Sequence, residues 1–149
     1  MFARPPVGMP PRGRTRRRLW ALVALAALVA VGLFLHGAGP ASTATDIAGD
    51  ALYAVAIYTG LVVLAPAARR STLVVIASVW CVAVELFQLT GLPRQLGAAF
   101  APAALVLGSG FSARDLVVYV AAIGVAGLVD GLVRRRSGMS SAVEGLDPS

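Results

Sequence analysis

Charged residues are scarce in this sequence, and one of the two common basic types is missing altogether. Only 13% of the 149 residues are charged, whereas 58% are hydrophobic, and the mean hydropathy is +0.80. All 13 basic residues are arginine, since the sequence contains no lysine. A soluble domain of this size cannot bury so much apolar surface, but a lipid bilayer accepts it. The composition therefore excludes an ordinary soluble domain and indicates an integral membrane protein.

Cysteine and histidine are nearly absent as well. Cys81 is the only cysteine and lies inside an apolar run, so a disulfide or a cysteine metal site within one chain is impossible. A cysteine nucleophile needs a neighbouring base, and the only histidine, His36, lies at the end of another apolar run. The sequence shows no Ser–His–Asp set, metal-ligand cluster or phosphate loop. We therefore expect neither a cofactor nor a familiar hydrolase or ATPase activity.

The arginines cluster at the ends of the apolar runs. They occur in "RGRTRRRLW", "AARRS" and "VRRRS", and they give a net charge of +6 and a pI near 11.0. A strongly basic chain can bind nucleic acid. Arginine clusters beside apolar runs are, however, the pattern that orients membrane helices. We therefore expect no nucleic-acid partner.

Four segments are long and apolar enough to cross a membrane. A spanning helix needs about 20 mostly apolar residues to cover about 30 Å of hydrocarbon, and the segments that qualify are 19–37, 47–66, 72–92 and 115–133. The first also resembles a signal peptide, because arginines precede it and "GPASTA" follows it. Its apolar core is longer than the usual signal-peptide core of about 7–15 residues, which favours a retained helix.

A fifth apolar stretch, 96–111, is the ambiguous one. Its most apolar part, 98–107, would give about 15 Å of helix at about 1.5 Å per residue, which is half a bilayer. Pro102 and the glycines in the stretch weaken a helix further. This length predicts a re-entrant or half-length segment and not a fifth span.

The arginine distribution supports four spans. With four spans, the arginines at 12–18, 69–70 and 134–136 all lie on one side, whereas a fifth span would place the last group on the other side. Arginine excess marks the cytoplasmic side. We therefore expect a multi-pass protein of the bacterial inner (plasma) membrane with both termini in the cytoplasm. Broken helix at membrane depth needs cover from protein or a wet cavity, so 96–111 is a candidate wall of a site.

The predicted fold class is all-α, a polytopic membrane helix bundle with four transmembrane helices and the short segment 96–111. The transmembrane domain is expected to cover 19–136. The Arg- and Pro-rich residues 1–18 and the small, polar residues 137–149 are expected to form disordered cytoplasmic tails.

Polar side chains from separate segments gather in the outer half of this bundle. Glu85 and Gln88 interrupt the third apolar run, "VWCVAVELFQLTG", and share a helix face because they are three positions apart. An ionised side chain near the bilayer centre costs about 2.5–3.5 kcal/mol, so Glu85 is expected to face inward. The candidate ligand-binding residues are Asp50, Tyr53, Glu85, Gln88, Arg94, Arg114, Asp115 and Tyr119.

The order "GDALYAVAIY", "VELFQLTGLPRQL", "LGSGFSARDLVVYVAAIG" resembles the bacterial membrane-protein family catalogued as domain of unknown function 2809, over roughly residues 40–128. The Glu-x-x-Gln helix, followed by an Arg and an Asp, is also similar to a shorter VanZ-like pattern at Glu85, Gln88 and Asp115. Tyr119 stands where VanZ-like proteins are expected to have Asn. VanZ-like proteins are associated with glycopeptide-antibiotic tolerance and envelope lipids, so this resemblance implies a role in the cell envelope.

The leading functional hypothesis is a small envelope protein whose outward-facing polar pocket binds a membrane lipid or a lipid-linked headgroup. Arg94 and Arg114 would hold an anionic group, for which the forked guanidinium is suited. Glu85, Gln88 and Asp115 would orient the ligand.

Two other hypotheses remain open. In the first, Glu85 and Gln88 are clamps between helices, the arginines neutralise nearby carboxylates, and the bundle is a structural partner of an envelope protein or of a second copy. Asp50 and Asp115 would then cap the outer ends of their helices. In the second, the protein is a small proton-coupled transporter, although the sequence shows no inverted repeat.

Two features mark the cytoplasmic end of the last span. Asp130 is expected to pair with the arginines that follow it in "VDGLVRRRS". Gly127 and Gly131 are four positions apart and form a small-xxx-small face, which predicts close packing against another helix.

Overall fold

The computed structural model describes residues 12–108 and 110–144, and within these ranges the chain is all-α, without strands. The helices, in chain order, are α1 (Arg12–Ala38), α2 (Thr43–Leu64), α3 (Arg70–Gln88), α4 (Leu92–Ala99), α5 (Ala101–Leu107) and α6 (Ala113–Glu144). Four of them, α1, α2, α3 and α6, are long and apolar enough to span a membrane. The predicted all-α membrane bundle with four spanning helices is confirmed.

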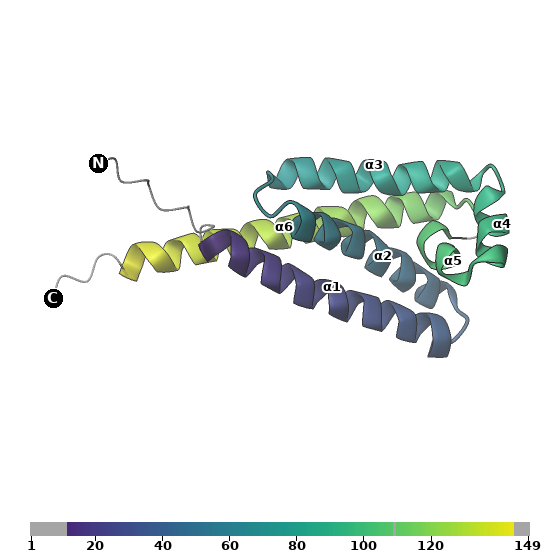
Figure 1. The fold of residues 1–149 in the computed structure, drawn as a ribbon, viewed down its shortest axis with the longest axis horizontal. Helices are drawn as coiled ribbons and strands as arrows, with labels where there is room; N and C mark the ends of the chain where they lie inside the picture. Colours follow the sequence, from purple (N-terminus) through teal and green to yellow (C-terminus); the bar gives the residue numbers. More distant parts are fainter. Residues whose placement is uncertain (1–11, 109, 145–149) are drawn as a thin grey trace, which may run out of the picture.

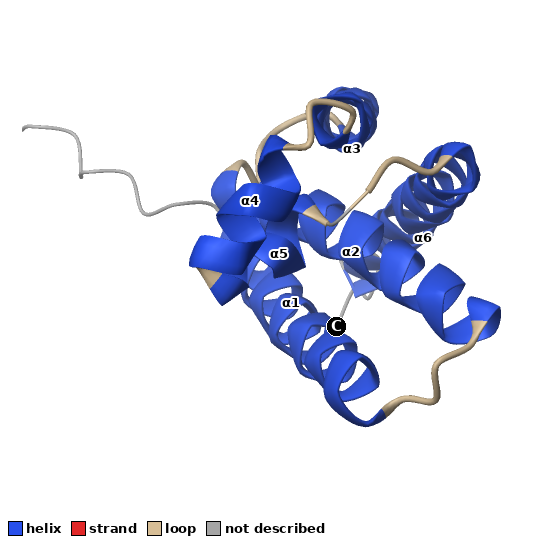
Figure 2. Cartoon of the chain, turned by 90° about the vertical axis from the view of Figure 1, so that its right-hand side faces the viewer, coloured by secondary structure: helices blue, strands red, loops and turns tan. Residues whose placement is uncertain are grey.

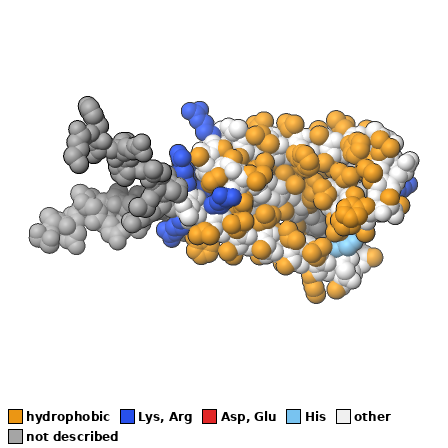
Figure 3. All heavy atoms as spheres, in the orientation of Figure 1, with side chains coloured by type: hydrophobic (Ala, Val, Ile, Leu, Met, Phe, Trp, Pro, Cys, Tyr) orange, Lys and Arg blue, Asp and Glu red, His pale blue; other side chains and the backbone are white. Residues whose placement is uncertain are grey.

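The four long helices run along the molecule, and the two short helices lie together at one end (Figure 1). We call this the α4–α5 end. The opposite end carries the start of α1, the α2–α3 loop and the last turns of α6, and basic side chains gather there (Figure 3). We call it the arginine end, and its exposed arginines include Arg14, Arg16, Arg18, Arg69, Arg70 and Arg134.

Helix α2 is the centre of the packing, since it contacts α1, α3 and α6, while α3 also packs on α6. On α3, buried residues recur every three to four positions, as expected for a helix that turns one face to its neighbours. The buried core includes Ala54, Tyr58 and Val62 of α2, Leu73, Ala77 and Cys81 of α3, and Tyr119 and Ile123 of α6. Many large apolar side chains face outward instead, which suits a lipid environment.

Helix α3 ends earlier than the predicted span 72–92. Its last residue is Gln88, because Gly91 takes a left-handed conformation (φ 73°) and Pro93 opens α4 within its first turn. Glycine at a helix end favours this left-handed turn. Glu85 therefore lies three residues from the end of α3, about 4.5 Å along the axis at about 1.5 Å per residue.

The stretch 96–111 does not cross the bundle. Its most apolar part, 98–107, is not one continuous helix, because Phe100 is extended (φ −145°, ψ 100°) and separates α4 from α5. Pro102, in the first turn of α5, favours such a break before it. The two short helices pack closely at Gly97, where an added Cβ would lie 2.9 Å from Ala104 Cβ. Viewed from this end, they lie beside the ends of the long helices (Figure 2).

The ends of α1 and α6 differ from the predicted tail boundaries. Residues 12–18 continue α1 toward the N-terminus, directly after two prolines, and residues 137–144 continue α6. Both segments were expected to be disordered, but they contain no proline to interrupt the helices that they extend. The rest of the predicted tails, 1–11 and 145–149, lies outside the described residues.

Candidate functional site

Glu85 is fully buried near the end of α3, and both of its carboxylate oxygens accept a hydrogen bond. The hydroxyl of Tyr119 on α6 donates to Oε1 at 3.1 Å, and the backbone N–H of Ser112 donates to Oε2 at 3.0 Å. A buried polar group is costly unless it is paired in this way. Glu85 thus ties α3 to α6 and to the loop that precedes α6.

Gln88 is also buried, but only half of its amide is paired. Its Nε2 donates to the carbonyl oxygen of Leu107, the last residue of α5, at 2.7 Å. Its Oε1 is buried and has no hydrogen-bond partner among the described residues. Leaving a buried acceptor unpaired costs about 1–3 kcal/mol. This atom therefore either destabilises the fold or accepts a hydrogen bond from a bound group.

Gly108 makes the close approach of Gln88 to the loop achievable. Its φ is +67°, in the left-handed region that glycine adopts readily. An added Cβ would lie 2.5 Å from Gln88 Nε2. The backbone conformation therefore favours glycine at this position, and a larger residue would displace the Gln88 amide.

Arg114 lies between two carboxylates from different helices. Its Nε donates to Asp115 Oδ1 at 3.2 Å, and its NH2 is 3.9 Å from Asp50 Oδ2 on α2. The Arg114 side chain is 44% exposed. The arginine thus pairs with Asp115, as one hypothesis expected, and part of its side chain remains exposed.

Ser112 joins Glu85 to Asp115, although it is not among the residues predicted from the sequence. Besides its N–H contact with Glu85, its hydroxyl donates to Asp115 Oδ1 at 2.7 Å. Ser112 and Asp115 are the first and last residues of "SARD". A Ser or Thr three positions before an acidic residue is the sequence pattern of a helix-capping box, so a signal for Ser112 was present.

Tyr53 connects α2 to α3 and to α6. Its hydroxyl accepts a hydrogen bond from Trp80 Nε1 on α3 at 3.1 Å. Its ring lies 5.9 Å from that of Tyr119, centroid to centroid, at an interplanar angle of 56°. Tilted aromatic pairs at this separation are favourable, so the two tyrosines are part of one packed polar region.

Arg94 lies on α4 and is exposed. An added Cβ on Gly110 would lie 3.8 Å from its NH2 atom, so the guanidinium is close to the loop between α5 and α6. All eight predicted site residues therefore lie at the α4–α5 end. Their assignment as ligand-binding residues stays a prediction.

The capping hypothesis for Asp50 was wrong. The N-cap of α2 is Ser42, whose hydroxyl accepts a hydrogen bond from the N–H of Thr45 at 3.2 Å, and Asp46 is the acidic residue of the first turn. Asp50 is the eighth residue of α2 and faces Arg114 instead. Among the described residues, no group of three or more His, Cys, Asp or Glu side chains is placed to hold a metal ion.

A second polar cluster lies toward the arginine end. Among the described side chains, Asp130 pairs with Arg17 of α1 at 2.6 Å and not with Arg134, whereas the side chains of Arg135 and Arg136 lie outside the described residues. The hydroxyl of Tyr58 donates to Asp130 at 2.9 Å, and Arg17 also donates to the carbonyl of Pro66 at 2.6 Å. Because α1 packs nearby, the guanidinium of Arg17 pairs with Asp130 in place of that of Arg134, one turn further along α6.

The small-residue face on α6 is confirmed. An added Cβ on Gly127 would lie 2.7 Å from Val74 Cγ2, and one on Gly131 would meet the guanidinium of Arg70. Arg70 donates to the carbonyl of Gly127 at 3.4 Å. The two glycines thus let α3 approach α6 closely.

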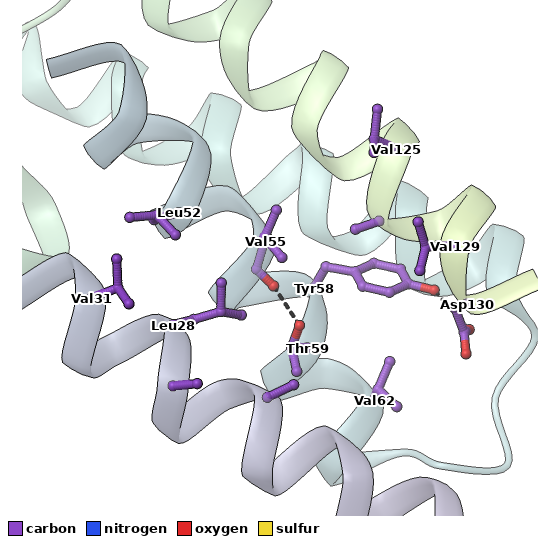
Figure 4. Close-up of a pocket in the computed structure, with 13 residues that line it drawn as sticks. Leu28, Val31, Leu52, Val55, Tyr58, Thr59, Val62, Val125, Val129 and Asp130 are labelled. Atoms are coloured by element: carbon purple, nitrogen blue, oxygen red, sulfur yellow. Dashed lines mark hydrogen bonds between the residues drawn. The ribbon is translucent and has the colours of Figure 1, made fainter. Parts of the chain in front are cut away.

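An apolar groove of about 550 Å³ lies between α1, α2 and α6. Leu28 and Val31 of α1, Leu52 and Val55 of α2, and Val129 of α6 are among the side chains around it (Figure 4). None of the eight predicted site residues lines this groove.

The family described as "Protein of unknown function (DUF2809)" matches residues 40–125, which is more than half of the chain. The chain belongs to this family. The DUF2809 match covers all eight predicted site residues and leaves out α1 and Asp130. No curated protein and no solved structure matches the chain at a significant level. The VanZ-like resemblance stays a prediction.

Proposed function

We propose that this DUF2809 protein binds the phosphate-bearing headgroup of a lipid or lipid-linked compound at its α4–α5 end. The observation that carries the proposal is the buried Oε1 of Gln88, which has no hydrogen-bond partner among the described residues and lies beside a loop flanked by two exposed arginines. Gly108 of that loop approaches Gln88, and Gly110, two residues on, lies close to Arg94. Arg114 follows the same loop at the start of α6.

The chemistry of these groups selects a particular kind of ligand. Gln88 Oε1 is an acceptor, so it calls for a hydroxyl or amine donor. A guanidinium carries five N–H donors and binds phosphate in a forked geometry. Arg114 uses Nε at Asp115, which leaves donors for a phosphate. A phosphate ester with a neighbouring hydroxyl or amine, as in many lipid headgroups, matches both requirements.

The proposed sidedness supports the same ligand class. The arginine end is expected to face the cytoplasm, because arginine excess marks that side of the membrane. The α4–α5 end would then face the outer surface of the bacterial plasma membrane. Headgroups of outer-leaflet lipids and of lipid-linked envelope precursors would reach Arg94 and Arg114 there.

Site-specific photocrosslinking in native membranes tests the proposal. A photoreactive residue at Phe111, which is 43% exposed in the loop, would sample the site. The matched control is Val117, which is 70% exposed and lies near the start of α6, at the same end of the bundle. We expect a phosphate-containing adduct by mass spectrometry that forms more at position 111 and is reduced by Arg114→Gln. Equal adducts at 111 and 117, unaffected by Arg114→Gln, would refute it.

A second candidate function is a structural bundle that docks another envelope protein or a second copy. The observation in its favour is Glu85, whose two oxygens are both satisfied within the chain. Arg114→Gln separates the two candidates. Exposed ion pairs contribute about 0–1 kcal/mol, so headgroup binding predicts loss of the adduct at an unchanged unfolding temperature. A purely structural role predicts no adduct in either protein.

A further inference from the structure

The groove between α1 and α6 is hollow because small residues stand where larger ones would fill it. Ala24 and Ala27 on α1 and Ala126 on α6 line it, above the surface of α2. Both α1 and α6 pack on α2, so α2 forms the floor and the other two helices form the walls. A volume of about 550 Å³ is within the range of about 300–1,000 Å³ typical of ligand sites.

The polar atoms that border the groove are already paired within the chain. The Thr59 hydroxyl donates to the carbonyl of Val55 at 2.7 Å, and the Tyr58 hydroxyl donates to Asp130 at 2.9 Å (Figure 4). Asp130 also accepts from Arg17. A ligand inside the groove would therefore meet apolar surface and gain little from polar groups of its own.

Arginines extend both walls of the groove, α1 and α6, toward the arginine end. On α1, Arg17 is seven positions before Ala24, and Arg14 is three positions before Arg17, so both follow the groove-lining face. On α6, Arg134 is four positions after Asp130. Arg14 and Arg134 are both exposed. An occupant with an apolar chain and an anionic head at this end would meet both requirements.

We infer that the groove holds one acyl chain of an anionic glycerophospholipid, whose phosphate lies between Arg14 and Arg134. This site is distinct from the α4–α5 end and does not depend on the proposed function. Basic groups at a membrane surface attract anionic lipids by about 1 kcal/mol each. A second copy is the less suited occupant, because in the same orientation it would bring its own arginine cluster against this one.

Native mass spectrometry of the full chain, purified and delipidated, tests the inference. The probes are phosphatidylglycerol and phosphatidylcholine with identical acyl chains. We expect one lipid bound per chain with a preference for phosphatidylglycerol. Arg14→Gln and Arg134→Gln should each lower the affinity for phosphatidylglycerol about fivefold, since about 1 kcal/mol corresponds to that factor, and leave phosphatidylcholine little changed.

A matched pair of variants on α1 locates the acyl chain. Ala27→Phe fills the groove, whereas Ala26→Phe adds the same bulk at an exposed position outside the lining. We expect Ala27→Phe to abolish the tight lipid and Ala26→Phe to retain it. Ala24→Phe is a second filling variant, should Ala27→Phe unfold the chain. Equal lipid binding by the filling and control variants would overturn the inference. So would a dimer that only the filling variants disrupt, because the occupant would then be a second copy.

Discussion

Arg17 and Asp130 lie 113 positions apart in the sequence, yet their side chains form a two-contact ion pair that joins α1 to α6. The Arg17 guanidinium donates from NH2 at 2.6 Å and from Nε at 3.3 Å, and only 12% and 15% of the two side chains is exposed. Both residues lie outside the segment matched by the DUF2809 family. The pair attaches α1 to the bundle, which favours a retained helix over a cleaved signal peptide.

Loss of this ion pair should loosen α1. Asp130→Asn leaves the largely buried Arg17 guanidinium without its counter-charge, and breaking such a pair is destabilising. After an allowance for the remaining exposure, we expect a loss of about 1–3 kcal/mol. Unfolding in detergent, followed by circular dichroism, measures the change. Arg16→Gln, at an exposed neighbouring position, is the control, and an equal effect of the two variants would contradict the role of the pair.

Glu85 should tolerate an amide but not an apolar side chain. In Glu85→Gln the amide oxygen can accept from Ser112 and the NH2 group can donate to the Tyr119 oxygen, so both contacts survive and only the Tyr119 O–H loses its acceptor. Glu85→Leu leaves the Ser112 N–H and the Tyr119 hydroxyl buried without their partner. Each unpaired group costs about 1–3 kcal/mol. We expect a smaller fall in unfolding temperature for the first variant than for the second; equal stability of the two would count against the observed network.

Three glycine-to-alanine variants separate backbone strain from steric overlap. Gly91→Ala introduces strain alone, since φ is +73° and no atom lies within 4 Å of the new Cβ. Gly108→Ala introduces the same backbone strain and also brings the new Cβ too close to Gln88 Nε2. Gly110→Ala places its Cβ only in ordinary van der Waals contact with Arg94. Left-handed backbone costs a non-glycine residue about 1–2 kcal/mol. Unfolding temperatures should therefore fall in the order Gly110→Ala, Gly91→Ala, Gly108→Ala, and a reversed order would contradict the loop geometry.

Helix α6 offers its own matched pair of glycines. Gly127→Ala places a Cβ 2.7 Å from Val74 Cγ2, so α3 and α6 must move apart, while Gly124→Ala meets nothing within 4 Å. Overpacking of this kind costs about 1–3 kcal/mol. We expect a lower unfolding temperature for Gly127→Ala only. Equal effects at the two positions would show that the helices are not in close contact there.

The sequence predicted the helices better than their ends and contacts. Long apolar runs and the arginine clusters were sufficient for the four spans, because lipid imposes both patterns on a spanning helix. The end of α3 was missed, although Gly91 in "LTGLP" is a recognisable stop signal. Pro102 and the glycines of 96–111 indicated a weakened helix, but they did not place the break at Phe100.

The shared location of the predicted polar residues followed from the sequence, whereas their pairings did not. The four-span topology brings Asp50, Glu85 and Asp115 to one end, and the structure places them there. Whether Glu85 meets an arginine or Tyr119 depends on helix rotation and crossing, which one sequence does not determine. The Arg17–Asp130 pair depends in the same way on how α1 crosses the bundle.

The most direct test of the proposed outward-facing site is the sidedness of the two ends of the bundle. In a Cys81→Ser background, Gln95→Cys places a thiol at an exposed position of α4, and an epitope tag is added after residue 149. A membrane-impermeant maleimide should label position 95 in intact cells, while the tag should react with antibody only after the membrane is opened. Labelling of the tag on intact cells, or protection of position 95 until lysis, would contradict an outward-facing polar site.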